Sequence, residues 1–234
     1  MKIIVANWKM NGNSQFAANY VAEIMAKLGK PAPNAEVVVC PPAPLLSANF
    51  APFKKGGQNC FIKERGAYTG EISAEIMRDT GCEYVIVGHS ERRYLGETSE
   101  QTSAKATCAH KAGLKAIICV GENKGEDRNK VVSEQLKASV PFSANEQNTI
   151  IAYEPVWAIG TGQTPNANDI EEAHQFIKSL KPLPVLYGGS VKAENAAEFL
   201  ALKSVDGLLV GGASLDITEF AEIIGAAKWT KTKF

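Results

Sequence analysis

The stretch "KIIVANWKMNGN" (2–13) decides between the two folds that the rest of the chain allows. It begins with a β-branched run that is typical of a strand buried on both faces. An open dinucleotide-binding sheet requires G-x-G-x-x-G directly after its first strand, and the residues "NWKMNGN" found here cannot form that loop. The stretch therefore argues against an open dinucleotide-binding fold.

Seven further runs have the composition of buried strands. They are "EVVVC" (36–40), "GGQNC" (56–60), "YVIVG" (84–88), "KAIICV" (115–120), "TIIAYE" (149–154), "PVLYGG" (184–189) and "DGLLV" (206–210). Most are continuous rather than alternating, as in strands of a parallel sheet that is covered on both faces. The run at 56–60 is the weakest and would not be assigned as a strand by itself.

Helical patterns lie between these runs. Apolar residues at i, i+3 and i+4 spacing predict one helix that stops at Gly29 and another that ends at Lys181. Their predicted buried faces are Ala17, Tyr20, Val21, Ile24, Met25 and Leu28 in the first, and Ile170, Ala173, Ile177 and Leu180 in the second. Thr98 and Gln101 form a capping-box signature for a third helix. The segment 213–228 is predicted to form the last helix.

Strand and helix alternate eight times at roughly 25–35 residues per unit, which leaves an open doubly wound sheet or a closed (β/α)8 barrel. The lone G-x-G, at Gly160 and Gly162, reaches Pro165 where the open fold needs a third glycine. We therefore predict an α/β protein with one (β/α)8 barrel domain over residues 1–234, because no linker interrupts the chain.

The composition excludes several classes of partner. Basic and acidic residues number 25 each, so no broad electrostatic footprint indicates binding to nucleic acid or to a membrane surface. The N-terminal apolar run has only four residues, too short for a signal peptide, and no run is long enough to span a membrane. Five scattered cysteines without a C-x-x-C pair suggest buried thiols in a reducing compartment, so we expect a cytoplasmic protein.

Polar residues stand at the C-terminal ends of several predicted strands, where the active sites of such barrels lie. Asn7 and Lys9 follow the first strand, His89 follows the fourth, and Glu154 ends the sixth. Taken singly, each has an ordinary alternative. Lys9 could be a surface lysine, His89 could make a hydrogen bond in the core, and Glu154 could be a carboxylate without a catalytic role. Their convergence on one barrel mouth favours an active site.

Paired glycines end the seventh and eighth strands, at Gly188-Gly189 and Gly211-Gly212. A glycine lets the backbone approach a ligand closely, and the start of a following helix presents N–H groups to an anion. Either pair alone is explained by a simple chain turn, but barrels often hold phosphate after strands seven and eight. We expect Gly211 and Gly212 to bind a phosphate, with the Ser190 hydroxyl and the Gly160 amide.

His89 and Glu154 are expected to differ in protonation. Ser90 is predicted to cap a short helix, whose start lowers the pKa of His89 and favours a neutral imidazole that donates to a carbonyl. Glu154 is expected to be the base, on the extended backbone that Pro155 favours.

Seven motifs give the chain a family resemblance. In order, "ANWKMN", "GGQN", "GAYTGEIS", "VGHSERR", "AYEPVWAIGTG", "LYGGSV" and "DGLLVGGASL" closely resemble the triosephosphate isomerase family, from residue 3 to about residue 217. The resemblance implies a TIM barrel and the reversible conversion of dihydroxyacetone phosphate and D-glyceraldehyde 3-phosphate through an enediolate, a step of glycolysis and gluconeogenesis. It implies neither a metal nor an organic cofactor.

The resemblance also implies a role for each candidate residue. Glu154 abstracts the carbon-bound proton, His89 polarises and protonates the oxygens, and Lys9 stabilises the enediolate and phosphate charge. Asn7 positions the substrate and the lysine. Glu91 resembles the family's buried acidic partner near that lysine and has a supporting role. The implied phosphate ligands are Gly160, Ser190, Gly211 and Gly212. Residues 155–163 resemble the family's lid, in which Gln163 replaces a common lysine.

The polar loop "RGAYTGEIS" (65–73) resembles the segment through which the family forms homodimers, which makes Thr69 an expected contact with a twin subunit. Two rival functions stay open at this point. Another phosphate-binding barrel isomerase shares the phosphate site but not Lys9, His89 and Glu154 together. A barrel reused as a binding protein needs none of the three.

Overall fold

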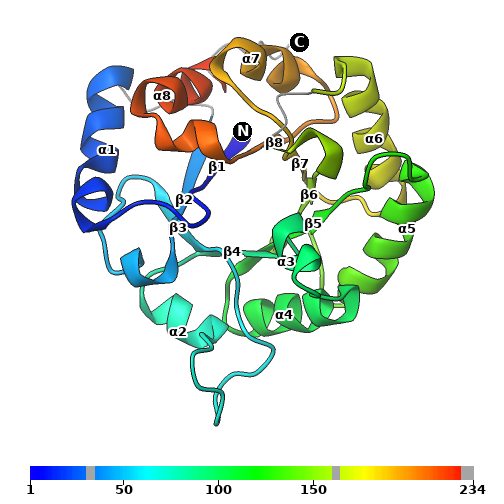
Figure 1. The fold of residues 1–234 in the computed structure, drawn as a ribbon, viewed down its shortest axis with the longest axis horizontal. Coiled ribbons are helices and arrows are strands. Elements are labelled where there is room, and N and C mark those ends of the chain that lie inside the picture. Colours follow the sequence, from blue (N-terminus) through cyan, green and yellow to red (C-terminus); the bar gives the residue numbers. More distant parts are fainter. Residues whose placement is uncertain (30–34, 160–163, 228–234) are drawn as a thin grey trace.

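A computed structural model describes residues 1–29, 35–159 and 164–227. Eight parallel strands form one closed barrel in the order β1 to β8, with helices around its outside (Figure 1). The strands are β1 (Lys2–Asn7), β2 (Ala35–Cys40), β3 (Lys54–Gly57), β4 (Tyr84–Val87), β5 (Lys115–Val120), β6 (Thr149–Tyr153), β7 (Val185–Tyr187) and β8 (Gly207–Val210). The helices are α1 (Ser14–Leu28), α2 (Ala74–Asp79), α3 (Ser90–Tyr94), α4 (Ser99–Lys111), α5 (Arg128–Ser139), α6 (Ala167–Leu180), α7 (Ala193–Ala201) and α8 (Ile217–Ala226), with 3-10 turns η1 (Ala43–Leu45), η2 (Val156–Ala158) and η3 (Gly212–Leu215). The predicted (β/α)8 TIM barrel is confirmed.

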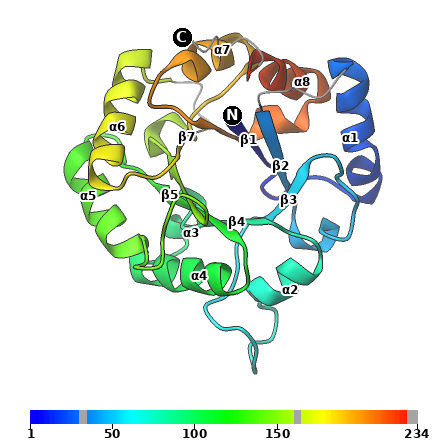
Figure 2. The same ribbon diagram turned by 180° about the vertical axis from the view of Figure 1, so that it is seen from behind.

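Each strand buries both of its faces, which explains the continuous apolar runs. Within β5, Ile117 and Cys119 point into the barrel, where they pack with side chains of the other strands. The alternate residues Ala116 and Ile118 face outward and pack in a second, larger cluster that includes the helices. Figure 2 shows the same ring of strands within its helical layer from the other end.

Local sequence signals account for the helix ends. Asn13 caps α1 by accepting from Phe16 N–H, and Gly29 ends it at a φ of 67°, a conformation that glycine adopts without strain. The capping box of Thr98 and Gln101 at the start of α4 is present as predicted. These caps fix where the chain leaves each helix to enter the next strand.

Several sequence-based predictions are wrong in detail. The third strand runs over Lys54–Gly57, not 56–60, because the glycines end it rather than begin it. Leu180 is 43% exposed, since it lies on the last turn of α6 beyond the buried face. The segment from 213 is not one helix, because Asp216 leaves the helical backbone and caps α8 as a separate helix.

The connection between β2 and β3 also departs from the regular pattern. It carries only the turn η1, whereas the other connections contain α-helices. Three prolines, at positions 41, 42 and 44, remove backbone donors from this segment and so prevent a regular helix. The barrel closes nevertheless, because β2 pairs with both of its neighbours.

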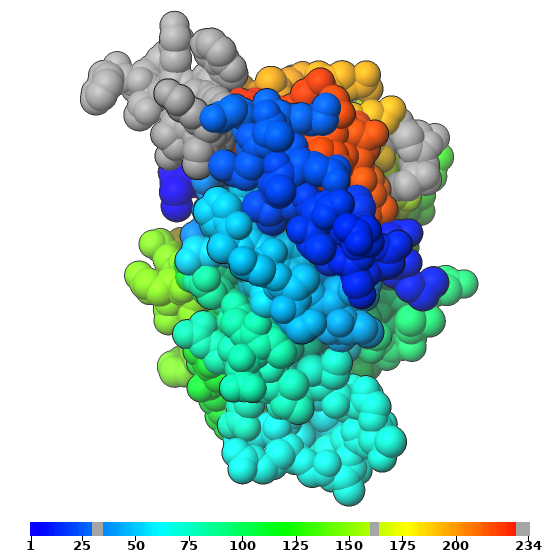
Figure 3. Space-filling model, turned by 90° about the vertical axis from the view of Figure 1, so that its left-hand side faces the viewer, coloured from blue at the N-terminus to red at the C-terminus, as the bar shows by residue number. Residues whose placement is uncertain are grey.

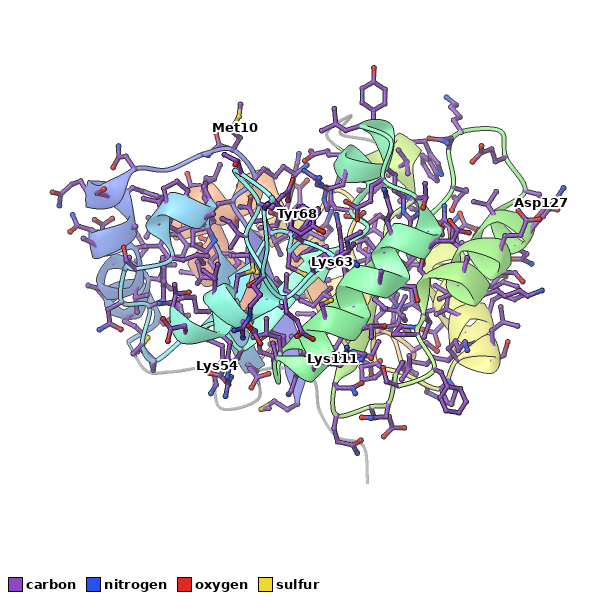
Figure 4. The ribbon with its side chains drawn as sticks, turned by 90° about the horizontal axis from the view of Figure 1, so that it is seen from below. Met10, Lys54, Lys63, Tyr68, Lys111 and Asp127 are labelled. Carbon is purple, nitrogen blue, oxygen red and sulfur yellow. The ribbon has the colours of Figure 1, made fainter. Side chains whose placement is uncertain are left out.

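The two ends of the barrel differ in what they carry. Met10, just after β1, and Lys54, at the start of β3, lie at opposite ends of the side view in Figure 4. The segment 65–73 projects from the body, at the bottom of Figures 1 and 3.

A helix that spans a membrane must be both long and apolar. In the part of the chain that the structure describes, no helix combines the length and the hydropathy that such a span requires.

Candidate active site

A cavity of about 450 Å³ opens at the C-terminal ends of the strands. Seven of the predicted site residues line it: Asn7, Lys9, His89, Glu154, Ser190, Gly211 and Gly212. The remaining lining comes from Ile159, Gly188, Gly189, Val191, Lys192, Leu209, Ala213 and Glu219. The eighth predicted residue, Gly160, lies outside the described residues. Chain segments far apart in the sequence thus meet at one mouth, as the barrel topology requires.

Glu154 directly follows β6 and is only 2% exposed, although it lines the cavity. Its backbone N–H continues the ladder by donating to the Val120 carbonyl at 2.8 Å, which fixes the direction of the side chain. One carboxylate oxygen lies 3.0 Å from His89 Nε2, and the other accepts from Ser90 N–H at 3.1 Å. Both oxygens of this cavity-lining side chain are therefore fixed by contacts with residues 89 and 90.

His89 leads from β4 into α3 and is itself the N-cap of that helix, a role we predicted for Ser90. Its Nδ1 accepts a hydrogen bond from Glu91 N–H at 3.2 Å. An accepting Nδ1 carries no proton, so in the neutral ring the proton belongs to Nε2, which then donates to Glu154. The cap therefore sets the tautomer that presents an N–H to the cavity.

Charge coupling between His89 and Glu154 governs their protonation. Burial lowers the pKa of His89, but the charge and hydrogen bond of Glu154, together with the charge of Glu91, outweigh burial, and the net pKa lies above the ordinary value. Burial raises the pKa of Glu154, but His89, the Ser90 N–H and Lys9 together outweigh burial, and the net pKa lies below the ordinary value. The expected lowering for His89 is wrong, because a carboxylate at 3.0 Å acts more strongly than the start of a five-residue helix.

Lys9 approaches the same cavity from the loop after β1. Its Nζ lies 2.5 Å from Glu91 Oε1, the acidic partner that the family resemblance implied. The implied burial of this partner is wrong, because the Glu91 side chain is 54% exposed at the start of α3. The backbone N–H of Lys9 donates to Asn7 Oδ1 at 3.1 Å, so the last residue of β1 orients the lysine. The ammonium group thus faces the His89 side of the mouth with a carboxylate beside it.

The glycines after β8 form an open wall. Gly212 begins η3, and a Cβ added there would meet no atom within 4 Å. A Cβ on Gly211 would meet Lys9 Cε at 3.3 Å. Since packing within the chain leaves the space beside Gly212 open, this wall has room for a ligand group close to the backbone. The nearby Ser190 hydroxyl donates to the Ala158 carbonyl at 2.6 Å in this structure.

Residues 155–159 of the predicted lid are anchored at its first end. The Trp157 indole donates to Glu122 Oε1 at 3.0 Å, and Val156 N–H donates to the Glu122 carbonyl at 3.0 Å. Tyr153, the last residue of β6, donates to the same buried carboxylate. The rest of the predicted lid, 160–163, lies outside the described residues.

Sequence reasoning missed two polar residues that follow strands at this mouth. Glu122 follows β5 by two residues, and the rule that found Glu154 would have found it too. Gln58 directly follows β3 and donates to the backbone of Lys9. It was missed because the third strand was predicted to start two residues too late, which placed Gln58 inside the strand rather than after it. Within the described part of the chain, no three His, Cys, Asp or Glu side chains cluster as metal ligands.

Comparisons with known proteins agree with this geometry. The family model described as triosephosphate isomerase matches residues 2–227. The chain is 45% identical to triosephosphate isomerase of Rhodopseudomonas palustris (strain BisA53), over 94% of this chain and 95% of that protein. It is 46% identical to triosephosphate isomerase of Mesorhizobium japonicum, over 96% and 95% of the two chains.

A solved structure gives the same result for the fold. The crystal structure of triosephosphate isomerase from Bartonella henselae at 1.6 Å resolution superposes with a TM-score of 0.86 and 38% sequence identity. The match covers 96% of this chain and 98% of that one. The chain belongs to the triosephosphate isomerase family.

Proposed function

We propose that this protein is a triosephosphate isomerase, an aldose–ketose isomerase that interconverts dihydroxyacetone phosphate and D-glyceraldehyde 3-phosphate. The reaction moves a proton between adjacent carbons through an enediolate. It therefore needs a base beside the carbon, a proton donor beside the oxygens and positive charge beside the phosphate. The cavity at the barrel mouth has side chains suited to all three tasks.

Glu154 is the proposed base and His89 the proposed proton donor. The lowered pKa of Glu154 keeps its carboxylate ionised near neutral pH, and its burial excludes the water that would otherwise solvate it. The Nε2–H of His89 lies 3.0 Å from that carboxylate, so a carbonyl oxygen entering the cavity meets a donor next to the base. This adjacent acid–base pair is the observation that carries the proposal.

Lys9 supplies the proposed positive charge, and the wall after β8 the proposed phosphate site. An ammonium group stabilises the enediolate oxygen and the phosphate as charge develops. Backbone N–H groups at the start of η3, from Gly212 onward, face an anion favourably, and Gly211 and Ser190 lie beside them in the same cavity. Asn7 holds the Lys9 backbone at 3.1 Å, which supports its proposed role in positioning the lysine.

A coupled assay with D-glyceraldehyde 3-phosphate tests the function. Glu154→Gln keeps the shape of the side chain but removes the base, so we expect turnover to fall roughly 10²- to 10⁴-fold. Glu172→Gln is the matched control, because that side chain is 68% exposed and lies on α6 outside the cavity. Equal turnover by the wild type and Glu154→Gln would refute the assignment of the base.

The same assay separates the two rival functions. A different phosphate-binding barrel isomerase would bind inorganic phosphate but fail to turn over either triose phosphate. A barrel reused only for binding would show no turnover of any sugar phosphate. The grouping of Lys9, His89 and Glu154 in one cavity favours the triose phosphate reaction over both.

We also propose a homodimer formed through the 65–73 loop, with Thr69 as a contact. Residues 65–71 are all exposed, and the loop stands clear of the barrel (Figures 1 and 3). Large apolar side chains at the mouth end are exposed as well, namely Met10 at 95% and Tyr94 at 91%. Such surfaces are typical of subunit contacts.

We propose a cytoplasmic location as well. All five cysteines are free thiols, as expected for a protein in a reducing compartment.

A further inference from the structure

Lys9 has an unusual backbone. Its φ of 52° is the only positive φ at a non-glycine position in the described part of the chain. A side chain with a Cβ is disfavoured in this left-handed region, so the surrounding structure must hold Lys9 there. The conformation matters because it sets the direction of a side chain that lines the cavity.

Two side chains hold the backbone of Lys9, one at its N–H and one at its carbonyl. Asn7 Oδ1 accepts from the Lys9 N–H at 3.1 Å, and Gln58 Nε2 donates to the Lys9 carbonyl at 2.9 Å. Asn7 is the last residue of β1, the strand that leads into the loop with Lys9. Gln58 directly follows β3. The contact from Gln58 therefore ties the loop to a separate part of the barrel.

The Gln58 amide group makes a second bond that fixes its own position. The same Nε2 donates to the Cys40 carbonyl at 2.8 Å, at the end of β2, and this carbonyl also accepts from Trp8 N–H at 3.1 Å. An amide nitrogen carries two hydrogens, which match the two carbonyls of Lys9 and Cys40. Methionine, of similar size, has no donor, and an ionised glutamate has only acceptors.

We propose that Gln58 is a positioning residue for Lys9. By donating to the carbonyls of Lys9 and Cys40, it holds the lysine in the left-handed backbone conformation that carries its ammonium group into the cavity. In that conformation Lys9 Nζ reaches Glu91, and Lys9 Cε passes within 3.3 Å of the position of a Cβ on Gly211. This role deepens the proposed function and rests on it.

A double-mutant cycle tests the proposal. The variants are Gln58→Met, Lys9→Met and both together, with binding of glycerol 3-phosphate, an inert analogue without a carbonyl, measured by calorimetry. We expect Gln58→Met to weaken binding about tenfold and to raise KM for the triose phosphate, while the double variant binds no more weakly than Lys9→Met. Gln175→Met, which removes an exposed glutamine amide on α6, is the control and keeps wild-type binding.

Two results would overturn the proposal. One is an unchanged affinity for glycerol 3-phosphate in Gln58→Met. The other is that Gln58→Met lowers this affinity by the same factor in the wild type and in the Lys9→Met variant. The second result would mean that Gln58 acts on general stability, which thermal unfolding of each variant measures separately. If the wild type fails to turn over triose phosphate, the proposed function fails, while the binding cycle still reports whether Gln58 acts through Lys9.

Gln58→Glu provides an independent readout. Its carboxylate turns acceptors toward two carbonyls, but its protonated form regains one donor. We expect the loss of glycerol 3-phosphate affinity, relative to wild type at the same pH, to shrink as pH falls from about 6 to about 4, because the ordinary pKa of glutamate is about 4.3. A loss that is independent of pH contradicts the positioning role.

Discussion

At the scale of single residues, a substitution at Gly212 is expected to weaken substrate binding while leaving the stability of the fold nearly unchanged. An added methyl group meets no protein atom within 4 Å, so Gly212→Ala is expected to change the free energy of unfolding by less than about 0.5 kcal/mol. The same methyl group occupies space at the proposed phosphate wall. We expect KM for triose phosphate to rise roughly tenfold, a loss of about 1.4 kcal/mol in binding. Steady-state kinetics and urea unfolding of one preparation measure both effects.

His174 gives a prediction for pH. It is fully buried between Tyr153 and Tyr187, and burial lowers its pKa to about 4. Below a pH of about 6.5 the unfolded chain binds a proton at this residue that the folded chain does not bind. Stability is therefore lost as pH falls from about 6.5, by up to about 3 kcal/mol, and this loss levels off below about pH 4.

The substitution His174→Phe isolates this contribution. Phenylalanine fits between the two tyrosines and does not titrate, so urea unfolding of the variant should depend less on pH between about 6.5 and 4. The histidine Nε2 has no hydrogen-bond partner among the described residues, which limits what the substitution removes to the contact of Nδ1 with the Ser204 carbonyl. Parallel pH profiles for the two proteins would refute the assignment.

The positions of individual site residues were predictable wherever a strand end was predictable. Glu154 and Lys9 follow apolar runs whose ends were right to within a residue or two, so the barrel topology alone put them in one cavity. Gln58 was missed because β3 has the sequence KKGG, without a branched apolar residue to mark it. The raised pKa of His89 depends on a carboxylate 65 positions away, which no local pattern contains.

At the scale of elements, two glycines in regular structure are expected to respond in opposite ways to alanine. In β8, a Cβ on Gly207 would lie 1.8 Å from the Ile3 carbonyl oxygen of β1, so Gly207→Ala must separate the strands that close the barrel. We expect a loss of at least about 3 kcal/mol in unfolding free energy. In α8, a Cβ on Gly225 meets no atom within 4 Å, so Gly225→Ala should gain about 0.5–1 kcal/mol.

Thermal and urea unfolding of the two variants provide the comparison. The prediction fails if Gly207→Ala unfolds like the wild type, or if Gly225→Ala is the less stable of the pair. Gly225→Ala also serves as the control for Gly212→Ala, since it adds the same methyl group away from the cavity.

Helices and strands were predicted best where the apolar pattern and the residues at the ends of the element indicated the same boundaries. β5 was predicted with the observed ends, and the capping box of α4 is formed by the expected Thr98 and Gln101. The 3-10 turn η1 and the break before α8 were not predicted. Both depend on the backbone at particular prolines or at Asp216 rather than on a repeating apolar pattern.

At the scale of the whole molecule, the proposed dimer predicts a solution mass of twice the chain mass of 25.1 kDa. Light scattering at micromolar concentration measures it. Thr69→Arg places a charge on the projecting loop and is expected to shift the mass toward one chain, while Glu172→Arg on the outside of α6 leaves it unchanged. A wild-type mass near that of one chain would refute the dimer.

The pairing of β1 with β8 has a consequence for how the protein is made. Ile3 is opposite Gly207 in the register, so the seam of the barrel joins the first strand to the last. Since synthesis runs from the N-terminus, β2 is available to pair with β1 long before β8 is, so the other edge of β1 has no partner until β8 has been made. Open hydrogen-bonding edges of this kind attract other chains. The edge of β1 is therefore open to pairing with other chains in the interval before β8 arrives.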